Sequence, residues 1–537
     1  MTSLAERGSL AARDSVLSTL KFGLALSAGA LIFGLLAGEL VQSGKSVDVI
    51  GLSLVLLPVA LWKRPHLAPV FILSAALLIE QVGQSVSPTN LNAPGAGDLV
   101  LTPTIPLTSH IPLFQGLGSL HLEPIDLLLV VVAIIYVAKS AEWESRWRPR
   151  SQLSRAVFGL VAVVVFGIVV GVSHHGSLRT SLMEARPYIY LGAAYMLTAS
   201  LIRNRATLRA CLWAVVIATA VKALQGVYVF VQVRNWHPRP EAVLGHEEAY
   251  SFGIFIMLVA ALWLFDVPGR LRKTATCLLP LVIAADLANN RRAAWLVLGG
   301  GILALAAVGY RSLPSRRRWL GRAALITLGA FAVYLPAYWN KDGGLAQPAR
   351  AIHSIISPDP RDASSDLYRL QEDANLKLNI KQGGVLGKGF GVPIDYALPI
   401  ANIKTIDPLI TYVPHNGVLY ILMRMGLLGG IAMWGLLATG IIAGCRLARS
   451  VDRELAAVGA LLVCTMVAYA LEGASDQGFF FYRIALVTGS LLGLAEAARY
   501  LLLARQTSAH PPPVSRASFA SRVSTTMPFG VPVEPEV

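Results

Sequence analysis

Long apolar stretches recur along this 537-residue chain from Lys21 to Leu503, and short polar segments separate them. A helix of about 18 or more apolar residues can cross a bilayer core of roughly 30 Å. Charged residues make up only 14% of the chain, whereas a soluble domain carries about 25%. The pattern predicts an all-α fold, a polytopic bundle of transmembrane helices.

The apolar runs predict about 14 spans, within a range of 12–14. They cover residues 21–40, 48–62, 66–83, 123–138, 154–173, 184–202, 208–232, 246–266, 273–288, 293–310, 320–339, 415–445, 454–472 and 479–503. Lysine and arginine gather in alternate loops, such as 311–322 and 446–453, as they do in cytoplasmic loops. We therefore expect both termini to be cytoplasmic.

One long polar segment, residues 340–413, interrupts this pattern and is expected to be a large, partly helical extracytoplasmic loop. The predicted order is a cytoplasmic N-terminus (1–20), the first part of the bundle (21–339), this loop, the last part of the bundle (414–503) and a cytoplasmic tail (504–537). The Pro-, Ser- and Thr-rich tail has the composition of a disordered segment. Residues 84–122 suit an outer loop or a short re-entrant element.

The net charge of +15 does not indicate a nucleic-acid partner, because the basic residues lie in short clusters between apolar runs. The four cysteines lie within or at the ends of apolar runs, so neither a disulfide framework nor a thiolate metal site is expected. The polar first 20 residues give no sign of a cleavable signal peptide.

Within the polar loop, Ser364-Ser365-Asp366 predicts a helix start, with a capping hydroxyl followed by an acid. The helix is expected to end near Gly383-Gly384. Leu367, Leu370, Ala374 and Leu378 recur at helical spacing, so they form an apolar face for the membrane surface or the bundle. The same helix carries Arg369, Lys377 and Lys381.

The segment from Gly387 to Gly391 is a glycine-rich turn around Lys388. A Walker phosphate loop is excluded by the spacing of the glycines and by the lack of Ser or Thr after the lysine. Two interpretations stay open: a flexible turn, or a backbone cradle for phosphate that Lys388 completes.

Two adjacent arginines, Arg291 and Arg292, lie at the outer mouth of the tenth predicted span. Cationic ends can extend to water without any function. However, paired outer arginines run against the charge bias of the loops, and charge at a membrane rim is costly enough to suggest function. We favour the functional interpretation.

His415 and Asn416 open a predicted span directly after the polar loop. A histidine at a helix start is often structural. This one lies at the predicted junction of the polar loop and the bilayer, where a substrate with a lipid tail would present its head group. Histidine can act as a general base or donate a hydrogen bond near neutral pH.

Four other polar residues near the predicted outer face, and one lysine inside a span, are further candidates. Glu184 and Arg186 begin the sixth span and either pair with each other or help to hold an acceptor. Glu472 and Asp476 flank the last short outer loop and offer an alternative base. Lys222 lies inside the seventh span, where it needs an acidic partner that the sequence does not identify.

Three motifs resemble the O-antigen ligase and O-antigen polymerase superfamily of bacterial polysaccharide enzymes, over roughly residues 285–430. They are Asn290-Arg291-Arg292-Ala293-Ala294-Trp295, the segment from Arg369 to Gly391, and Pro414-His415-Asn416-Gly417-Val418-Leu419 followed by Gly426-Leu427-Leu428-Gly429. A weaker match is Gly245-His246-Glu247-Glu248. The chain departs from the family pattern at Asn290, Asp373 and Gly384, where relatives usually have Ser, Trp and Pro.

The resemblance implies a membrane glycosyltransferase that needs no metal or cofactor. It would move a glycan from an undecaprenyl-pyrophosphate carrier to a glycan or lipid acceptor at the outer leaflet of the bacterial inner membrane, among membrane lipids. Catalytic roles are implied for His415, Arg369 and one or both of Arg291 and Arg292. Substrate-binding roles are expected for Lys377, Lys381, Lys388, Asn416, Glu184, Arg186, His246 and Glu247.

Two other classes of protein stay open from the sequence. A transporter or flippase of lipid-linked glycans would need ionisable or unwound sites near the bilayer midplane, but the unusual polar residues of this chain concentrate at the predicted outer rim. An inactive assembly partner that faces the outside is the third possibility. The sequence does not distinguish a polymerase from a ligase.

Overall fold

The computed structural model describes residues 60–79, 113, 123–140, 151–233, 243–341, 344–358, 360–400 and 409–509. The predicted N-terminal segment, the first span, most of the second, nearly all of 84–122 and the tail beyond residue 509 lie outside the described residues. Within the described ranges the regular elements are helices and no strand occurs. The all-α prediction is confirmed for this part of the chain.

Within the described residues, a helix covers most of each predicted apolar run from 66–83 onward. The matching helices are α3 (Ala68–Leu78, preceded by the 3-10 turn η1, Pro65–Leu67), α4 (Pro124–Ser140), α5 (Gln152–Ser173), α6 (Leu178–Leu201), α7 (Arg205–Val233), α8 (His246–Leu264), α9 (Arg270–Asn289), α10 (Arg292–Ser312), α11 (Arg317–Tyr338, preceded by η5, Pro314–Arg316), α14 (Gly417–Leu447), α15 (Arg453–Ser475) and α16 (Tyr482–Ala509).

Among the described residues, eight helices are long and apolar enough to cross a bilayer: α5, α7, α8, α10, α11, α14, α15 and α16. This finding supports a membrane protein. The remaining matching helices, α3, α4, α6 and α9, are not in this set, and α3 has only 11 residues. The count of about 14 spans therefore stays a prediction.

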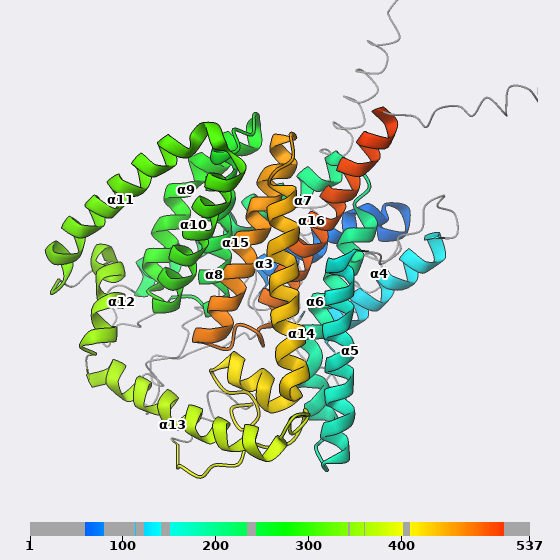
Figure 1. Ribbon diagram of the computed structural model, residues 1–537, viewed down its shortest axis with the longest axis vertical. Coiled ribbons are helices and arrows are strands. Elements are labelled where there is room, and N and C mark those ends of the chain that lie inside the picture. Colours follow the sequence, from blue (N-terminus) through cyan, green and yellow to red (C-terminus); the bar gives the residue numbers. More distant parts are fainter. Residues whose placement is uncertain are drawn as a thin grey trace, which may run out of the picture.

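The polar segment contributes the 3-10 turn η6 (Gly344–Ala346), α12 (Gln347–Ile356) and α13 (Pro360–Gly383). In Figure 1, α13 lies across one end of the bundle, where α14 and α16 begin and α15 ends. The predicted helix ends where expected, at Gly383, but it begins at Pro360 instead of near Ser364. Proline suits the first turn of a helix, because its missing N–H would have no partner there.

The apolar face predicted for α13 does not pack on the bundle. Leu367 and Leu370 are 56% and 68% exposed, whereas Glu372 and Leu376 are buried. The bundle alternative is therefore wrong, and contact of this face with the membrane surface stays a prediction. Besides Leu376, the buried side of α13 carries polar residues that bind the backbone of the segment that follows.

Two buried asparagines of α13 hold that segment. The Oδ1 atom of Asn375 accepts hydrogen bonds from the backbone N–H groups of Ala397 and Leu398, at 2.9 and 2.8 Å. The side-chain amide of Asn379 bonds both backbone groups of Asp395, at 2.8 and 3.0 Å. These bonds fix residues 395–398 against the helix.

The glycine-rich turn docks into a break in α14. At Gly426 the backbone leaves the helical region (φ 58°, ψ −151°), and the N–H of Leu427 donates to the carbonyl of Val385 at 2.9 Å. The carbonyls of Met423 and Arg424 accept from turn residues 388 and 389. Unsatisfied backbone groups at membrane depth cost several kcal/mol each, so the turn completes the hydrogen bonding of the broken helix.

The same bonds exclude the phosphate cradle. The N–H of Lys388 donates to Met423 at 2.7 Å, that of Gly389 to Arg424 at 3.0 Å, and that of Phe390 to Gly167 at 3.1 Å. The N–H of Gly391 donates to the carboxylate of Glu184 at 3.3 Å. Because protein acceptors already use these donors, the cradle interpretation is wrong and the segment is a structural turn.

Close approach of the turn to α5 gives a test of this docking. A Cβ at Gly171 would lie 1.9 Å from the carbonyl oxygen of Phe390, so we expect Gly171→Ala to destabilise the fold by about 1–3 kcal/mol through overpacking. Gly159→Ala on the same helix is the matched control, because its Cβ meets nothing within 4 Å. Thermal unfolding in detergent measures the difference, and equal midpoints for the two variants would contradict the docking.

Candidate functional site

One face of α13 covers the first residues of α14 and the last residues of α15. Tyr368, Arg369, Glu372 and Asp373 contribute to it, since residues three and four apart in a helix are neighbours on its surface. Each of these side chains contacts a residue next to an end of α14 or α15. This face therefore organises the candidate site.

His415 is held by Glu372. Its backbone N–H donates to Oε2 of Glu372 at 2.9 Å, and its Nδ1 lies 3.3 Å from both carboxylate oxygens. The edge of the imidazole meets the Tyr368 ring, with the ring centroids 5.7 Å apart. Burial lowers the pKa of His415, but the hydrogen bond and charge of Glu372, together with the charge of Asp476, outweigh it and raise the pKa above its usual range.

Asn416 is the N-cap of α14. Its Oδ1 accepts the N–H of Leu419 at 3.1 Å, and its Nδ2 donates to the two carboxylate oxygens of Asp373 at 3.2 and 3.3 Å. Capping by an asparagine side chain satisfies one of the free N–H groups at a helix start. Asn416 therefore fixes the start of α14 directly beside His415.

Arg369 reaches the other end, at the last turn of α15. Its guanidinium donates to the carbonyl of Ser475 at 2.9 Å and lies 3.9 Å from Oδ2 of Asp476. The same oxygen lies 2.9 Å from Nδ1 of His246, the first residue of α8. Burial raises the pKa of Asp476, but the hydrogen bond and electrostatic effect of His246, with those of Arg369 and His415, hold it well below its usual range.

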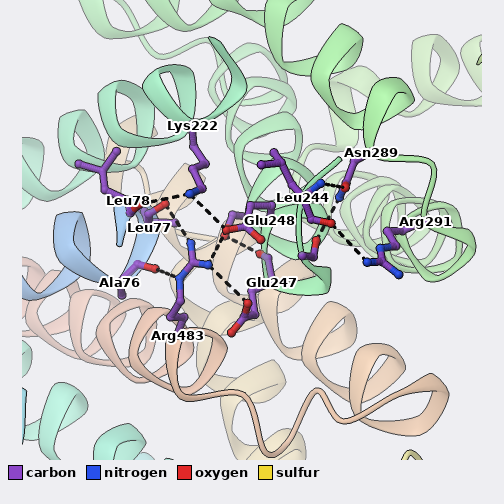
Figure 2. A network of polar contacts seen from close by, with 12 residues as sticks. Ala76, Leu77, Leu78, Lys222, Leu244, Glu247, Glu248, Asn289, Arg291 and Arg483 are labelled. Carbon is purple, nitrogen blue, oxygen red and sulfur yellow. Dashed lines mark hydrogen bonds and ion pairs between the residues drawn. The ribbon is translucent and has the colours of Figure 1, made fainter. Parts of the chain in front are cut away.

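Arg291 and Arg292 point to different places. Arg291 donates to the carbonyl of Leu244 at 3.3 Å, beside Asn289, which binds the N–H of the same residue at 2.8 Å (Figure 2). Its guanidinium also lies close enough to His246 and Glu472 to interact with them electrostatically. Arg292 instead donates to the Ser354 hydroxyl at 3.3 Å, on α12.

The structure therefore brings several of the predicted site residues together around two buried carboxylates, Glu372 and Asp476. We call this set the rim cluster: His246, Arg291, Arg369, Glu372, His415 and Asp476. The printed contacts of Arg292 are to Ser354 on α12 and, at 4.0 Å, to Asp366 on α13. Asp476, which the sequence suggested as an alternative base, contacts His246 on α8 and Arg369 on α13.

The predicted pair of Glu184 and Arg186 is wrong. Glu184 binds the guanidinium of Arg424 at 2.7 Å and accepts a hydrogen bond from Tyr420 at 3.1 Å. Arg186 binds Glu123 at 2.7 Å. Residues two apart on a helix point in different directions, so each finds its own partner. Both side chains are buried, and their proposed contact with substrate stays a prediction.

Arg424 connects α14 to the glycine-rich turn and is fully buried. Besides Glu184, its guanidinium donates to the carbonyls of Gly389, Val392 and Tyr412, at 3.1, 2.5 and 2.7 Å. Arg424 was not among the residues singled out from the sequence as candidates for the site. An arginine inside an apolar run is itself a signal for a paired or functional charge.

A second buried network holds Glu247 (Figure 2). Arg483 on α16 contacts both Glu247 and Glu248, with Glu247 at 3.4 Å, and donates to the carbonyl of Ala76 at the end of α3, at 2.8 Å. Lys222 lies 3.6 Å from Glu248, which is therefore the acidic partner that it needed. Glu247 lies next to His246 in the chain, so this network also fixes the start of α8.

The three lysines of the insert differ in their surroundings. Lys377 and Lys381 are exposed on α13. Lys388 binds Asp395 at 2.6 Å and Asn379 at 2.8 Å, so it ties the glycine-rich turn to the segment that α13 holds. The geometry gives Lys388 a structural contact, and the binding roles of Lys377 and Lys381 stay predictions.

Part of the chain matches a known protein family. Residues 275–434 match the model of the family described as O-Antigen ligase. The match contains Arg291, Arg369 and His415 and supports the O-antigen ligase and polymerase superfamily, as the sequence motifs predicted. It also supports a membrane glycan ligase or polymerase that acts in polysaccharide assembly. A search among curated proteins found no match to the chain.

The buried pair of Arg424 and Glu184 predicts a large effect on stability. Arg424→Met leaves the Glu184 carboxylate buried without its cation, so we expect a loss of about 3–5 kcal/mol in the free energy of unfolding. Arg453→Met breaks an ion pair with Asp266 in which the two side chains are 62% and 45% exposed. It should cost far less, because solvent screens an exposed pair. Unfolding in detergent compares the variants, and similar losses would refute the assignment.

Proposed function

We propose that this protein transfers a glycan from an undecaprenyl-pyrophosphate carrier to a sugar or lipid acceptor at the outer leaflet, without a metal ion. The observation that carries the proposal is the rim cluster, in which Arg369 contacts Asp476 and His415 contacts Glu372. Arg291 lies beside them, against the carbonyl of Leu244 that precedes α8. The alternate distribution of basic loop residues supports an extracytoplasmic position for this end of the bundle.

Arg369 and Arg291 suit the pyrophosphate leaving group. A guanidinium forms planar, paired hydrogen bonds with phosphate oxygens and stays charged when it is partly dehydrated. Stabilisation of the charge that develops on the leaving group is often the largest contribution to catalysis. Arg369 keeps a 41% exposed side chain although it contacts Asp476, so part of it is open to a ligand.

His415 suits the acceptor. Its imidazole would take the proton of an acceptor hydroxyl while the hydroxyl oxygen forms a bond to the anomeric carbon of the donor sugar. The bond from that carbon to the phosphate oxygen breaks, and undecaprenyl pyrophosphate leaves with the electron pair. A base with a pKa near the operating pH is effective in such a step.

The position of the cluster also suits a substrate with a lipid tail. The cluster lies where apolar helices α8, α10, α14 and α15 begin or end, so a polar head group would meet it while its tail stays among lipids. Exposed Lys377 and Lys381 on α13 would add attraction for the anionic head group, and Asn416 beside His415 would help to place the acceptor.

The different orientations of the paired arginines give a direct test. Arg291→Ala and Arg369→Ala are each expected to lower kcat by about 10²–10³, the usual loss when one group that stabilises transition-state charge is removed. Arg292→Ala should lower it by less than about fivefold, the equivalent of a surface ion pair. Initial rates of glycan transfer in proteoliposomes measure these effects.

Normal accumulation and an unchanged unfolding midpoint show that each arginine variant is folded. If Arg292→Ala lost as much activity as Arg291→Ala, or if Arg369→Ala kept wild-type turnover, the assignment of the pyrophosphate site would be wrong.

The acceptor class follows from one incubation. Purified protein is supplied with lipid-linked repeats alone, and the products are separated by size. A ladder of lengthening products identifies a polymerase, because the repeat is then both donor and acceptor. Transfer that appears only after a separate acceptor is added identifies a ligase. Movement of the intact lipid-linked glycan across vesicles without any transfer would instead identify a transporter.

A further inference from the structure

We infer that Glu372 is a positioning residue for His415, which it holds with the proton on Nδ1 and the free electron pair on Nε2. This inference rests on the proposed function, because it names the residue that prepares His415 as the base. Glu372 was not among the residues singled out from the sequence. It lies four residues before Leu376, on the buried side of α13.

The geometry defines which ring nitrogen carries the proton. Both oxygens of the Glu372 carboxylate lie 3.3 Å from Nδ1 of His415, and an ionised carboxylate can only accept hydrogen bonds. Nδ1 must therefore donate, and in the neutral imidazole Nε2 is then the nitrogen that can take a proton. The histidine base of serine proteases is oriented by a carboxylate in the same way.

Burial and hydrogen bonding hold the Glu372 carboxylate in place, so it can orient the imidazole of His415. Its side chain is only 3% exposed, and it also accepts the backbone N–H of His415 at 2.9 Å. The Tyr368 ring meets the imidazole edge to face, which limits rotation of the ring. The carboxylate thus fixes the backbone and the side chain of His415 together, while 25% of the histidine side chain stays exposed.

The other charges around His415 come from the helices that pack on it. On α13, Arg369 lowers the pKa of His415 and Glu372 raises it; from the end of α15, Asp476 raises it. Asp373 on α13 binds the adjacent Asn416. Removing the Glu372 charge should therefore lower the pKa of His415, and the imidazolium that forms during transfer would lose its closest counter-charge.

The test uses Glu372→Gln in the full chain. Glutamine keeps an oxygen for the backbone N–H of His415 but removes the negative charge. The base works only when neutral, so activity falls below the pKa of His415. We expect the acid limb of the kcat profile to move to lower pH by about one unit and kcat to fall about tenfold or more, with little change in KM for the donor. A residue with only a structural role would not move the limb.

Asp373→Asn is the matched comparison, because it removes a neighbouring carboxylate of the same helix that does not bond the imidazole. Its acid limb should stay at the wild-type position, whatever its turnover. An equal shift in both variants would show a general effect of charge and would overturn the inference.

A second measurement does not depend on turnover. Diethyl pyrocarbonate modifies a histidine when its imidazole is neutral but not when it is protonated. Peptide mass spectrometry reports the extent of modification of His415 as the pH is varied. The midpoint should lie higher in the native wild type than in the denatured chain, and lower in Glu372→Gln than in the native wild type. An unchanged midpoint in a folded Glu372→Gln protein would overturn the inference.

The two readouts separate this inference from the proposed function. If the modification midpoint moves but transfer and its pH profile do not, Glu372 positions His415 but His415 is not the base. Should Glu372→Gln fail to fold, the wild-type comparison still decides: a native midpoint at or below that of the denatured chain would overturn the role of Glu372.

Discussion

Two buried carboxylates, Glu372 and Asp476, are the constraint on which the site depends. A buried charge is tolerated only when it is paired and hydrogen-bonded, and these two obtain their partners from different parts of the chain. Glu372 on α13 takes the imidazole and backbone of His415, and Asp476 after α15 takes Arg369 and His246. Satisfying these acids therefore forces the polar insert, α8, α14 and α15 to meet, and the partners that meet there form the candidate site.

The same rule operates away from the site. Arg424 with Glu184, and Arg483 with Glu247 and Glu248, are buried ion pairs between helices. Such pairs add little net stability compared with apolar packing, but losing one partner is costly. They therefore restrict how the helices can be arranged around the rim cluster, because any other packing would leave a charge without its counter-charge.

Much of the fold follows from local pattern, and much of the site does not. Apolar runs placed α5 and α7 within a few residues, and the clustering of motifs singled out Arg369 and His415, whose catalytic roles stay proposals. The sequence did not reveal Glu372, because its partner lies 43 residues away and neither local spacing nor hydropathy connects them. The bundle alternative for the apolar face of α13 and the pairing of Glu184 with Arg186 were wrong, since tertiary contacts decided both. The orientation of Arg291 against Arg292 likewise depends on which helix end lies nearby.

The interruption of α14 at Gly426 has a consequence for comparing and recombining related enzymes. Backbone groups of the membrane helix find their partners in residues 385–389, so the helix and the polar segment share one hydrogen-bond register. The insert is then no exchangeable cassette. A chimera that imports another loop would inherit a helix with open backbone groups unless the glycines at 171 and 426, and the contacts around them, travelled with it.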